Sequence, residues 1–173
     1  MKRYFSNQQG FTLVELMIGL ALTVILLSGI FGLLDSSLRS WRFGSGRTEV
    51  QQTARYAMDT MVRELKYGTN FHADNAYTIS YVEASTGNSY KYFLDTTDHI
   101  LYRQPVIPAG TSQPVTGLNV QNSTNVLINQ ENQTLFQSSD SNAVKITLTA
   151  TDTVTNQSVA LRTVVYSQQK FLQ

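Results

Sequence analysis

Residues 11–34 read FTLVELMIGLALTVILLSGIFGLL, a run of 24 residues in which 20 are apolar or glycine and only Glu15 is ionisable. At a rise of about 1.5 Å per residue, a helix of this length crosses a hydrocarbon core of roughly 30 Å with some tilt. Ten residues precede the run and carry Lys2 and Arg3 but no acid. Because basic flanks stay in the cytoplasm, the sequence predicts one membrane-spanning helix with the rest of the chain outside.

Three interpretations compete for this run. A secretory signal peptide has an apolar region of about 7–15 residues followed by a small-x-small cleavage site, whereas this run is longer and ends in LLDSSLRSW. A plain transmembrane anchor fits the length, but a carboxylate near its start costs about 2.5 kcal/mol or more. The third interpretation is a processed segment in which Glu15 has a function of its own.

The stretch GFTLVE, from Gly10 to Glu15, resembles the N-terminal methylation motif of type IV pilins and pseudopilins, with the basic leader and the apolar helix in register. The resemblance implies that a membrane-embedded prepilin peptidase cuts after Gly10 and that Phe11 becomes the methylated N-terminus. It also implies that Glu15, the fifth mature residue, serves filament assembly. The expected partners are the peptidase, other pilin or pseudopilin subunits, an inner-membrane assembly platform and membrane lipid.

A physical argument gives Glu15 the same role. Cleavage would create a free amine at Phe11, and two opposite buried charges in contact avoid the cost of staying unpaired. A neighbouring subunit shifted by about one helical turn, roughly 5.4 Å, brings its amine to this carboxylate. Repeated head to tail, such a contact does not close and generates a helical filament. The alternative is a Glu15 that is protonated or reaches the membrane interface.

Beyond Leu34 the helical pattern continues. Leu34, Leu38 and Trp41 recur at helical spacing, and a second apolar stripe follows from residue 50 to residue 65. The residues around Gly44–Gly46 are the expected bend or break, and Lys66 with Gly68 the expected stop. We therefore expect one long helix whose amphipathic second half packs against a sheet.

From about residue 70 the pattern changes to β-branched and aromatic alternation. The sequence predicts a meander of three strands and then a surface loop over 104–117, which holds all three prolines. The strands of the meander are expected at 77–83, 90–94 and 100–103. Beyond the loop, strands are expected at 118–120, 126–128, 134–136, 143–151 and 158–167, the last two joined by a turn at 152–156.

The expected fold is α+β and pilin-like: a long N-terminal transmembrane and amphipathic helix packed on an antiparallel β-sheet domain. We expect a cleaved leader over 1–10, the transmembrane and assembly segment over 11–34, the amphipathic continuation over 35–68 and an exposed β domain over 69–173. The segments QTARYAMDTMVRELKYGTN and YKYFLDTTDHILYRQ resemble minor subunits of the PilW or pseudopilin J type.

Composition excludes several other classes. The chain of 173 residues has no cysteine, which excludes disulfides and thiol chemistry, and its net charge of +1 argues against nucleic-acid binding by the bulk of the chain. We expect no catalytic residue, metal site or cofactor. His72 and His99 occur in unrelated contexts, and Asp95 and Asp98 lack the spacing of a calcium loop and are better read as a turn. Three Asn-x-Ser/Thr triplets, at Asn122, Asn132 and Asn156, are expected by chance.

Two functions follow. In the first, the protein is a structural minor pilin or pseudopilin that enters a fibre for adhesion, motility, DNA uptake or protein export. In the second, it is a monomeric, membrane-anchored binding domain outside the cytoplasm that keeps its leader and is indifferent to Glu15→Ala. Gly10 and Glu15 favour the first. Before assembly, it is expected in the cytoplasmic membrane, with its C-terminal domain outside.

Overall fold

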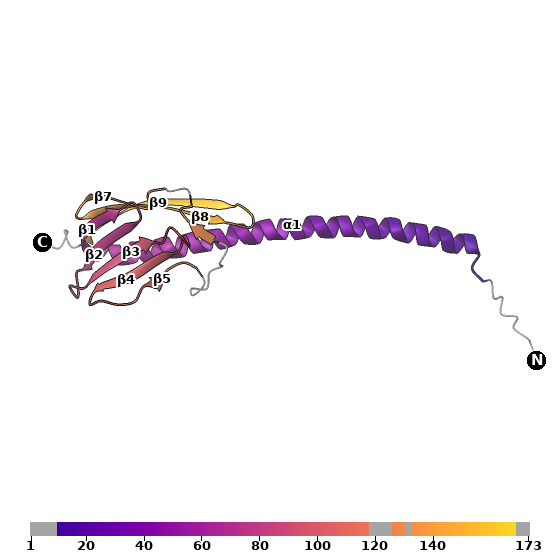
Figure 1. The fold of residues 1–173 in the computed structure, drawn as a ribbon. Coiled ribbons are helices and arrows are strands. Elements are labelled where there is room, and N and C mark those ends of the chain that lie inside the picture. Colours follow the sequence, from indigo (N-terminus) through magenta and orange to yellow (C-terminus); the bar gives the residue numbers. More distant parts are fainter. Residues whose placement is uncertain (1–9, 118–125, 131–132, 169–173) are drawn as a thin grey trace, which may run out of the picture. The chain divides into compact units, whose positions relative to one another are not determined.

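The computed structural model describes residues 10–117, 126–130 and 133–168. Within these described residues, a helix, α1, runs from Leu13 to Leu65, and nine strands follow it (Figure 1). The chain divides into two compact units, 1–41 and 42–173. α1 contributes its N-terminal part to the first and its C-terminal part to the second.

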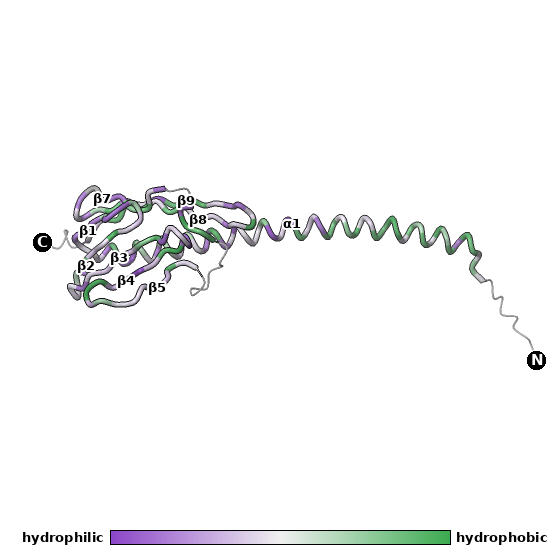
Figure 2. The backbone as a smooth tube through the Cα atoms, viewed as in Figure 1, coloured by the Kyte–Doolittle hydropathy of each residue, from purple (hydrophilic) through white to green (hydrophobic). Residues whose placement is uncertain are grey.

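The first unit consists, in its described part, of α1 up to Trp41 and the short segment ahead of it. Every side chain from Leu13 to Trp41 is exposed, and most are apolar, as the green colour of this stretch shows (Figure 2). α1 is long and apolar enough to cross a membrane by length and composition. Since these side chains are not covered by the protein, their helix is suited to an apolar surrounding rather than to water.

In the second unit, α1 is amphipathic as expected. Its buried side recurs at helical spacing and is rich in small residues, which allow strands to approach closely; it comprises Gly46, Val50, Thr53, Ala54, Ala57, Met58, Met61 and Leu65. The helix does not break at Gly44–Gly46. It ends at Leu65, just ahead of the expected stop.

The first sheet is antiparallel, with five strands in the order β1-β2-β3-β4-β5. The expected meander is confirmed by β2, β3 and β4. The strands are β1 (Gly68–Asn75), β2 (Thr78–Glu83), β3 (Ser89–Leu94), β4 (Leu101–Ile107) and β5 (Gln113–Pro114).

The expected loop over 104–117 is wrong in part, because β4 continues to Ile107 and β5 lies within it. Pro105 is tolerated in β4 because β5 pairs only with Tyr102 and Arg103, so the proline takes no bond from that ladder. On its other side, Pro105 pairs with Tyr90 next to a register shift. Three prolines in this segment therefore do not exclude a strand.

The second sheet is centred on β8 (Ala143–Asp152). β9 (Ser158–Tyr166) pairs with it from Ala143–Tyr166 to Thr151–Ser158, and the turn expected at 152–156 joins them. β6 (Val126–Ile128) and β7 (Phe136–Asp140) pair with opposite ends of β8. The expected strand at 134–136 begins only at Phe136, and the one expected at 118–120 lies outside the described residues.

Both sheets share one core with α1, whose C-terminal part lies between them (Figure 1). Met61 of the helix, Tyr92 of the first sheet and Leu148 of the second are all fully buried in this cluster. The first sheet also contacts the turn between β7 and β8, where the Phe71 N–H donates to the Ser141 carbonyl at 2.8 Å. The expected α+β, pilin-like architecture, with a long helix packed on antiparallel sheet, is confirmed.

Candidate processing and assembly segment

Gly10 and Phe11 lie ahead of the first helical residue, Leu13. Gly10 is exposed, with no side chain or distant backbone within 4 Å of where its Cβ would be, and Phe11 is 89% exposed. The peptide bond between them therefore lies outside the hydrogen-bonded helix. A peptidase needs such an accessible, non-helical backbone at the bond it cuts.

Thr12 and Glu15 form a capping box at the start of α1. The Thr12 N–H and its hydroxyl both donate to Oε2 of Glu15, each at 3.0 Å, and the Glu15 N–H donates to Oγ1 of Thr12 at 3.2 Å. The Thr12 carbonyl accepts the first helical bond, from the Leu16 N–H at 3.2 Å. Thr12 is thus the N-cap, and the two side chains satisfy amide groups that the helix leaves free.

This cap fixes where the Glu15 carboxylate lies. It is folded back over the first turn, close to the residue that follows Phe11, and it faces the positive end of the helix dipole. The sequence argument identified Gly10, Phe11 and Glu15 but missed Thr12. The signal was present as T-x-x-E directly before an apolar run, the usual sequence sign of a capping box.

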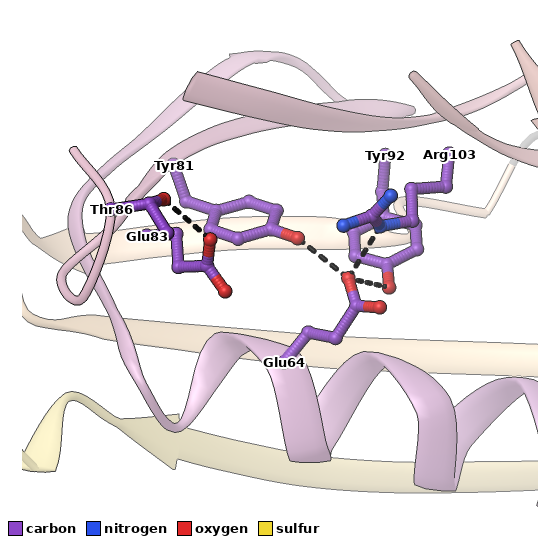
Figure 3. Close-up of polar contacts among 6 residues, drawn as sticks. All are labelled: Glu64, Tyr81, Glu83, Thr86, Tyr92 and Arg103. Carbon is purple, nitrogen blue, oxygen red and sulfur yellow. Dashed lines mark hydrogen bonds and ion pairs between the residues drawn. The ribbon is translucent and has the colours of Figure 1, made fainter. Parts of the chain in front are cut away.

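A second polar cluster lies in the other unit, at the end of α1 (Figure 3). Oε2 of Glu64 accepts hydrogen bonds from the hydroxyls of Tyr81 and Tyr92, each at 2.7 Å, and from Nε of Arg103 at 2.6 Å. The Arg103 guanidinium also lies over the Tyr90 ring, 4.2 Å from its centroid. The cluster therefore connects α1 to three consecutive strands, β2, β3 and β4.

The protonation states in this cluster are fixed by its contacts. Burial acts to raise the pKa of Glu64, but the two tyrosine hydroxyls and Arg103 outweigh it and leave that pKa below its usual value. Burial and the nearby carboxylate raise the pKa of Tyr81 and Tyr92. Burial acts to lower the pKa of Arg103, but Glu64 outweighs it and raises that pKa. At neutral pH the carboxylate is charged and all three partners keep their protons, so the cluster serves as a structural hub.

The segment around Asp95 is a turn, as expected. The Asp95 carboxylate accepts from the Thr97 N–H at 2.8 Å, and Asp98 accepts from the Ile100 N–H at 2.9 Å and from the Tyr102 hydroxyl at 2.9 Å. Nδ1 of His99 lies 3.1 Å from the Ile128 carbonyl. These contacts use the carboxylates to close the turn, and within the described ranges no three acidic or His side chains form a metal-binding group.

The other singled-out polar residues are not brought together. Exposed His72 on β1 has Nε2 3.6 Å from a carboxylate oxygen of Asp74. Asn156 belongs to the turn between β8 and β9, where its N–H donates to the Asp152 carbonyl at 2.8 Å. Asn122 and Asn132 lie outside the described residues.

Comparison with known proteins adds one positive finding. Residues 5–31 match the family model of the prokaryotic N-terminal methylation motif, a stretch that includes Gly10, Phe11, Thr12 and Glu15. No curated protein and no solved structure matches the chain. The similarity to the PilW or pseudopilin J type is not confirmed. The chain thus carries a prepilin-type signal at its N-terminus, a motif typical of processed subunits of the type IV pilin or pseudopilin kind.

Proposed function

We propose that this protein is a minor pilin or pseudopilin. A prepilin peptidase cuts it between Gly10 and Phe11, the new amine of Phe11 is methylated, and Glu15 directs its assembly into a type IV pilus or a type II secretion-like filament. The observation that carries the proposal is the exposed Gly10–Phe11 bond directly ahead of a capped, apolar helix, in register with the methylation motif.

The capping box supports the cleavage step. Thr12 is the N-cap of α1, so Gly10 and Phe11 lie directly ahead of the point where the backbone becomes helical. Cutting there removes the leader without breaking a helical hydrogen bond. The second residue of the mature chain, Thr12, is then the N-cap, and α1 begins with the third, Leu13, which leaves the new amine close to the membrane-crossing segment.

The chemistry of Glu15 supports the assembly step. Among the described residues, the hydrogen bonds that hold its carboxylate come from the neutral donors of Thr12. The amine of a neighbouring subunit, shifted by about one turn, supplies the opposite charge that a carboxylate needs once helices pack together away from water. This contact joins two different surfaces and repeats without closing, which is the geometry of a helical fibre.

The proposed organisation follows from this segment. Residues 1–10 are a cytoplasmic leader, 11–34 cross the cytoplasmic membrane and later form the fibre core, 35–68 continue the helix, and 69–173 form the domain outside. Other subunits bind along the N-terminal helix, and an inner-membrane assembly platform receives the processed chain. The minor type rests on the PilW-like segments, among them YKYFLDTTDHILYRQ, which contributes β3 and the start of β4.

The first test is the intact mass and N-terminal residue of the full chain recovered from membranes of cells that express a prepilin peptidase. We expect a chain that begins with N-methylated Phe11. The Gly10→Val variant should remain a membrane-inserted precursor, while Gly44→Ala, a glycine change on the exposed side of the helix, should be processed normally. A wild-type chain that still begins at Met1 would favour the membrane-anchored binding domain, and mature Gly10→Val protein would contradict the assigned cut.

A further inference from the structure

We propose that Trp41 is an interfacial anchor that binds the phospholipid headgroup region on the outer side of the membrane and sets the depth of α1 in the bilayer. Its indole is 69% exposed, although it is among the largest apolar side chains of the protein. The assignment of the outer side rests on the proposed function; the lipid contact itself does not.

The spacing of charges along α1 defines where the hydrocarbon begins and ends. Glu15 and Asp35 are 20 residues apart, and no residue between them is ionisable. In a continuous helix this separation is about 30 Å, the thickness of a typical hydrocarbon core. Glu15 and Asp35 therefore lie at its two boundaries, and the residues that follow Asp35 enter the headgroup region.

Apolar character nevertheless continues past Asp35. Leu34, Leu38 and Trp41 follow one another at spacings of four and three residues, so they share one side of the helix. Leu38 and Trp41 are both exposed. Between them, Nη2 of Arg39 lies 2.7 Å from the Asp35 carboxylate, an exposed pair of opposite charges one turn apart. An apolar strip beside a charged pair suits the boundary between acyl chains and headgroups better than water or hydrocarbon.

The length of the helix places Trp41 in that region. Trp41 follows Asp35 by six residues, about 9 Å along the helix axis, and each headgroup region is about 5–8 Å thick if the bilayer is about 40–45 Å and its core about 30 Å. Because helical side chains tilt toward the N-terminus, the indole reaches back into this layer. Tryptophan concentrates at membrane interfaces because its ring is apolar while its N–H needs a hydrogen-bond acceptor. Phosphate and ester oxygens supply such acceptors. The anchor at one end then holds Gly10 and Phe11 in the opposite headgroup region, where water for peptide hydrolysis is available.

Trp41 is the only tryptophan of the chain, so its fluorescence reports on this position alone. The full chain is reconstituted into phosphatidylcholine vesicles that carry bromine either near the glycerol end or near the methyl end of the acyl chains. We expect emission shifted to shorter wavelength than in water, with at least about twofold stronger quenching by the shallow bromine than by the deep one.

Two double variants calibrate depth in the same protein. Ile25→Trp/Trp41→Phe moves the indole to the exposed residue halfway between Glu15 and Asp35. Its fluorescence should be quenched more strongly by the deep bromine than by the shallow one. Val154→Trp/Trp41→Phe moves it to the exposed turn of the second unit, and should give emission as in water with full acrylamide quenching.

Three results for the wild-type chain would overturn the proposal. The first is emission like that of the Val154 variant, which places Trp41 in water. The second is stronger quenching by the deep bromine than by the shallow one, as in the Ile25 variant, which places Trp41 in hydrocarbon. The third is Trp41 fluorescence that neither bromine position quenches and that becomes less accessible to acrylamide as the protein-to-lipid ratio rises. This result would mean that another subunit covers Trp41. Because the assay needs no peptidase, a failure of processing leaves its result unaffected.

Discussion

Arg103 on β4 donates its Nε–H to Oε2 of Glu64 at a distance of 2.6 Å and so joins the end of α1 to the fourth strand of the first sheet. Both side chains are more than two-thirds buried, at 23% and 29% exposure. Such a pair is costly to break from one side, because the remaining charge and the hydrogen-bond donors around it lose their partner without returning fully to water.

The first prediction is that Glu64→Ala lowers the free energy of unfolding by about 2–3 kcal/mol, since it leaves Arg103 and two buried tyrosine hydroxyls unpaired. Urea unfolding of the full chain in detergent micelles, followed by near-ultraviolet circular dichroism of the packed tyrosines, measures this loss. Asp59→Asn, which removes an exposed charge from the same helix, is the control and should change stability by less than about 0.5 kcal/mol. Equal effects of the two variants would show that the cluster contributes nothing specific.

The second prediction concerns pH. Tyrosine and arginine contacts hold the pKa of Glu64 below its usual value against the opposing effect of burial. A depressed pKa gives stability that is fully present above the unfolded value, about 4.3, and is lost as pH falls through the folded value. The stability difference between wild type and Glu64→Gln should therefore be constant from about pH 7 down to about pH 5 and shrink below that. A difference that changed between neutral and alkaline pH would point to another group.

The Glu64 cluster contains features that the sequence predicts and one that it does not. The strand pattern predicted β2, β3 and β4, whose register sets Tyr81 opposite Tyr90 and Tyr92 opposite Arg103. Glu64 lies three residues after Met61 and seven after Ala57, on the same side of α1 as the core. A carboxylate on the buried side of a helix needs hydrogen-bond donors nearby, because burying it unpaired is costly. Their identity depends on how the helix is rotated against the sheet, which residue spacing alone does not determine.

The third prediction compares Gly46 and Gly44, two glycines that the sequence alone does not distinguish. A Cβ on Gly46 would lie 2.7 Å from Oδ2 of Asp152 and from Oγ1 of Thr155, in the turn between β8 and β9. Asp152 cannot easily move, because its carboxylate also accepts the N–H groups of Val154 and Thr155. Gly46→Ala should therefore cost about 1–3 kcal/mol through overpacking.

Gly44→Ala is the matched variant, because nothing lies within 4 Å of its Cβ position. It should raise stability by about 0.8–1.0 kcal/mol through helix propensity alone. The same urea assay compares the two. Stabilisation by both substitutions would mean that the helix and the turn are not in contact at Gly46.

The fourth prediction concerns a hydroxyl inside the core. Oγ1 of Thr53 on α1 is buried and has no hydrogen-bond partner among the described residues. Thr53→Val keeps the shape and removes the unsatisfied group, so it should raise the free energy of unfolding by about 1–2 kcal/mol. Thr48 is the control, since its exposed hydroxyl donates to the Gly44 carbonyl at 3.0 Å. Thr48→Val should change stability little, and an equal gain there would trace the effect to helix propensity.

The parts of the fold that sequence reasoning missed have weak local signals. β1 reads GTNFHADN, with two register shifts against β2, and lacks the regular apolar alternation that marked β8. It is a strand because Phe71 enters the core and its N–H donates to the carbonyl of Ser141 in the turn between β7 and β8, a contact between residues 70 positions apart. The N-terminal segment is the opposite case, because its length, charge and capping signal are all local.

The last prediction separates the two uses of Glu15. Glu15→Gln keeps a side-chain oxygen that accepts from the Thr12 N–H, so amide exchange at the start of α1 should stay slow, whereas Glu15→Ala should speed it. Both variants lack the charge that pairs with the amine of a neighbouring subunit. If pairing drives assembly, both should enter sheared fibres at least about tenfold less than wild type, a difference of about 1.4 kcal/mol, while inserting and losing the leader normally. Wild-type incorporation of Glu15→Gln alone would assign assembly to the cap rather than to the charge.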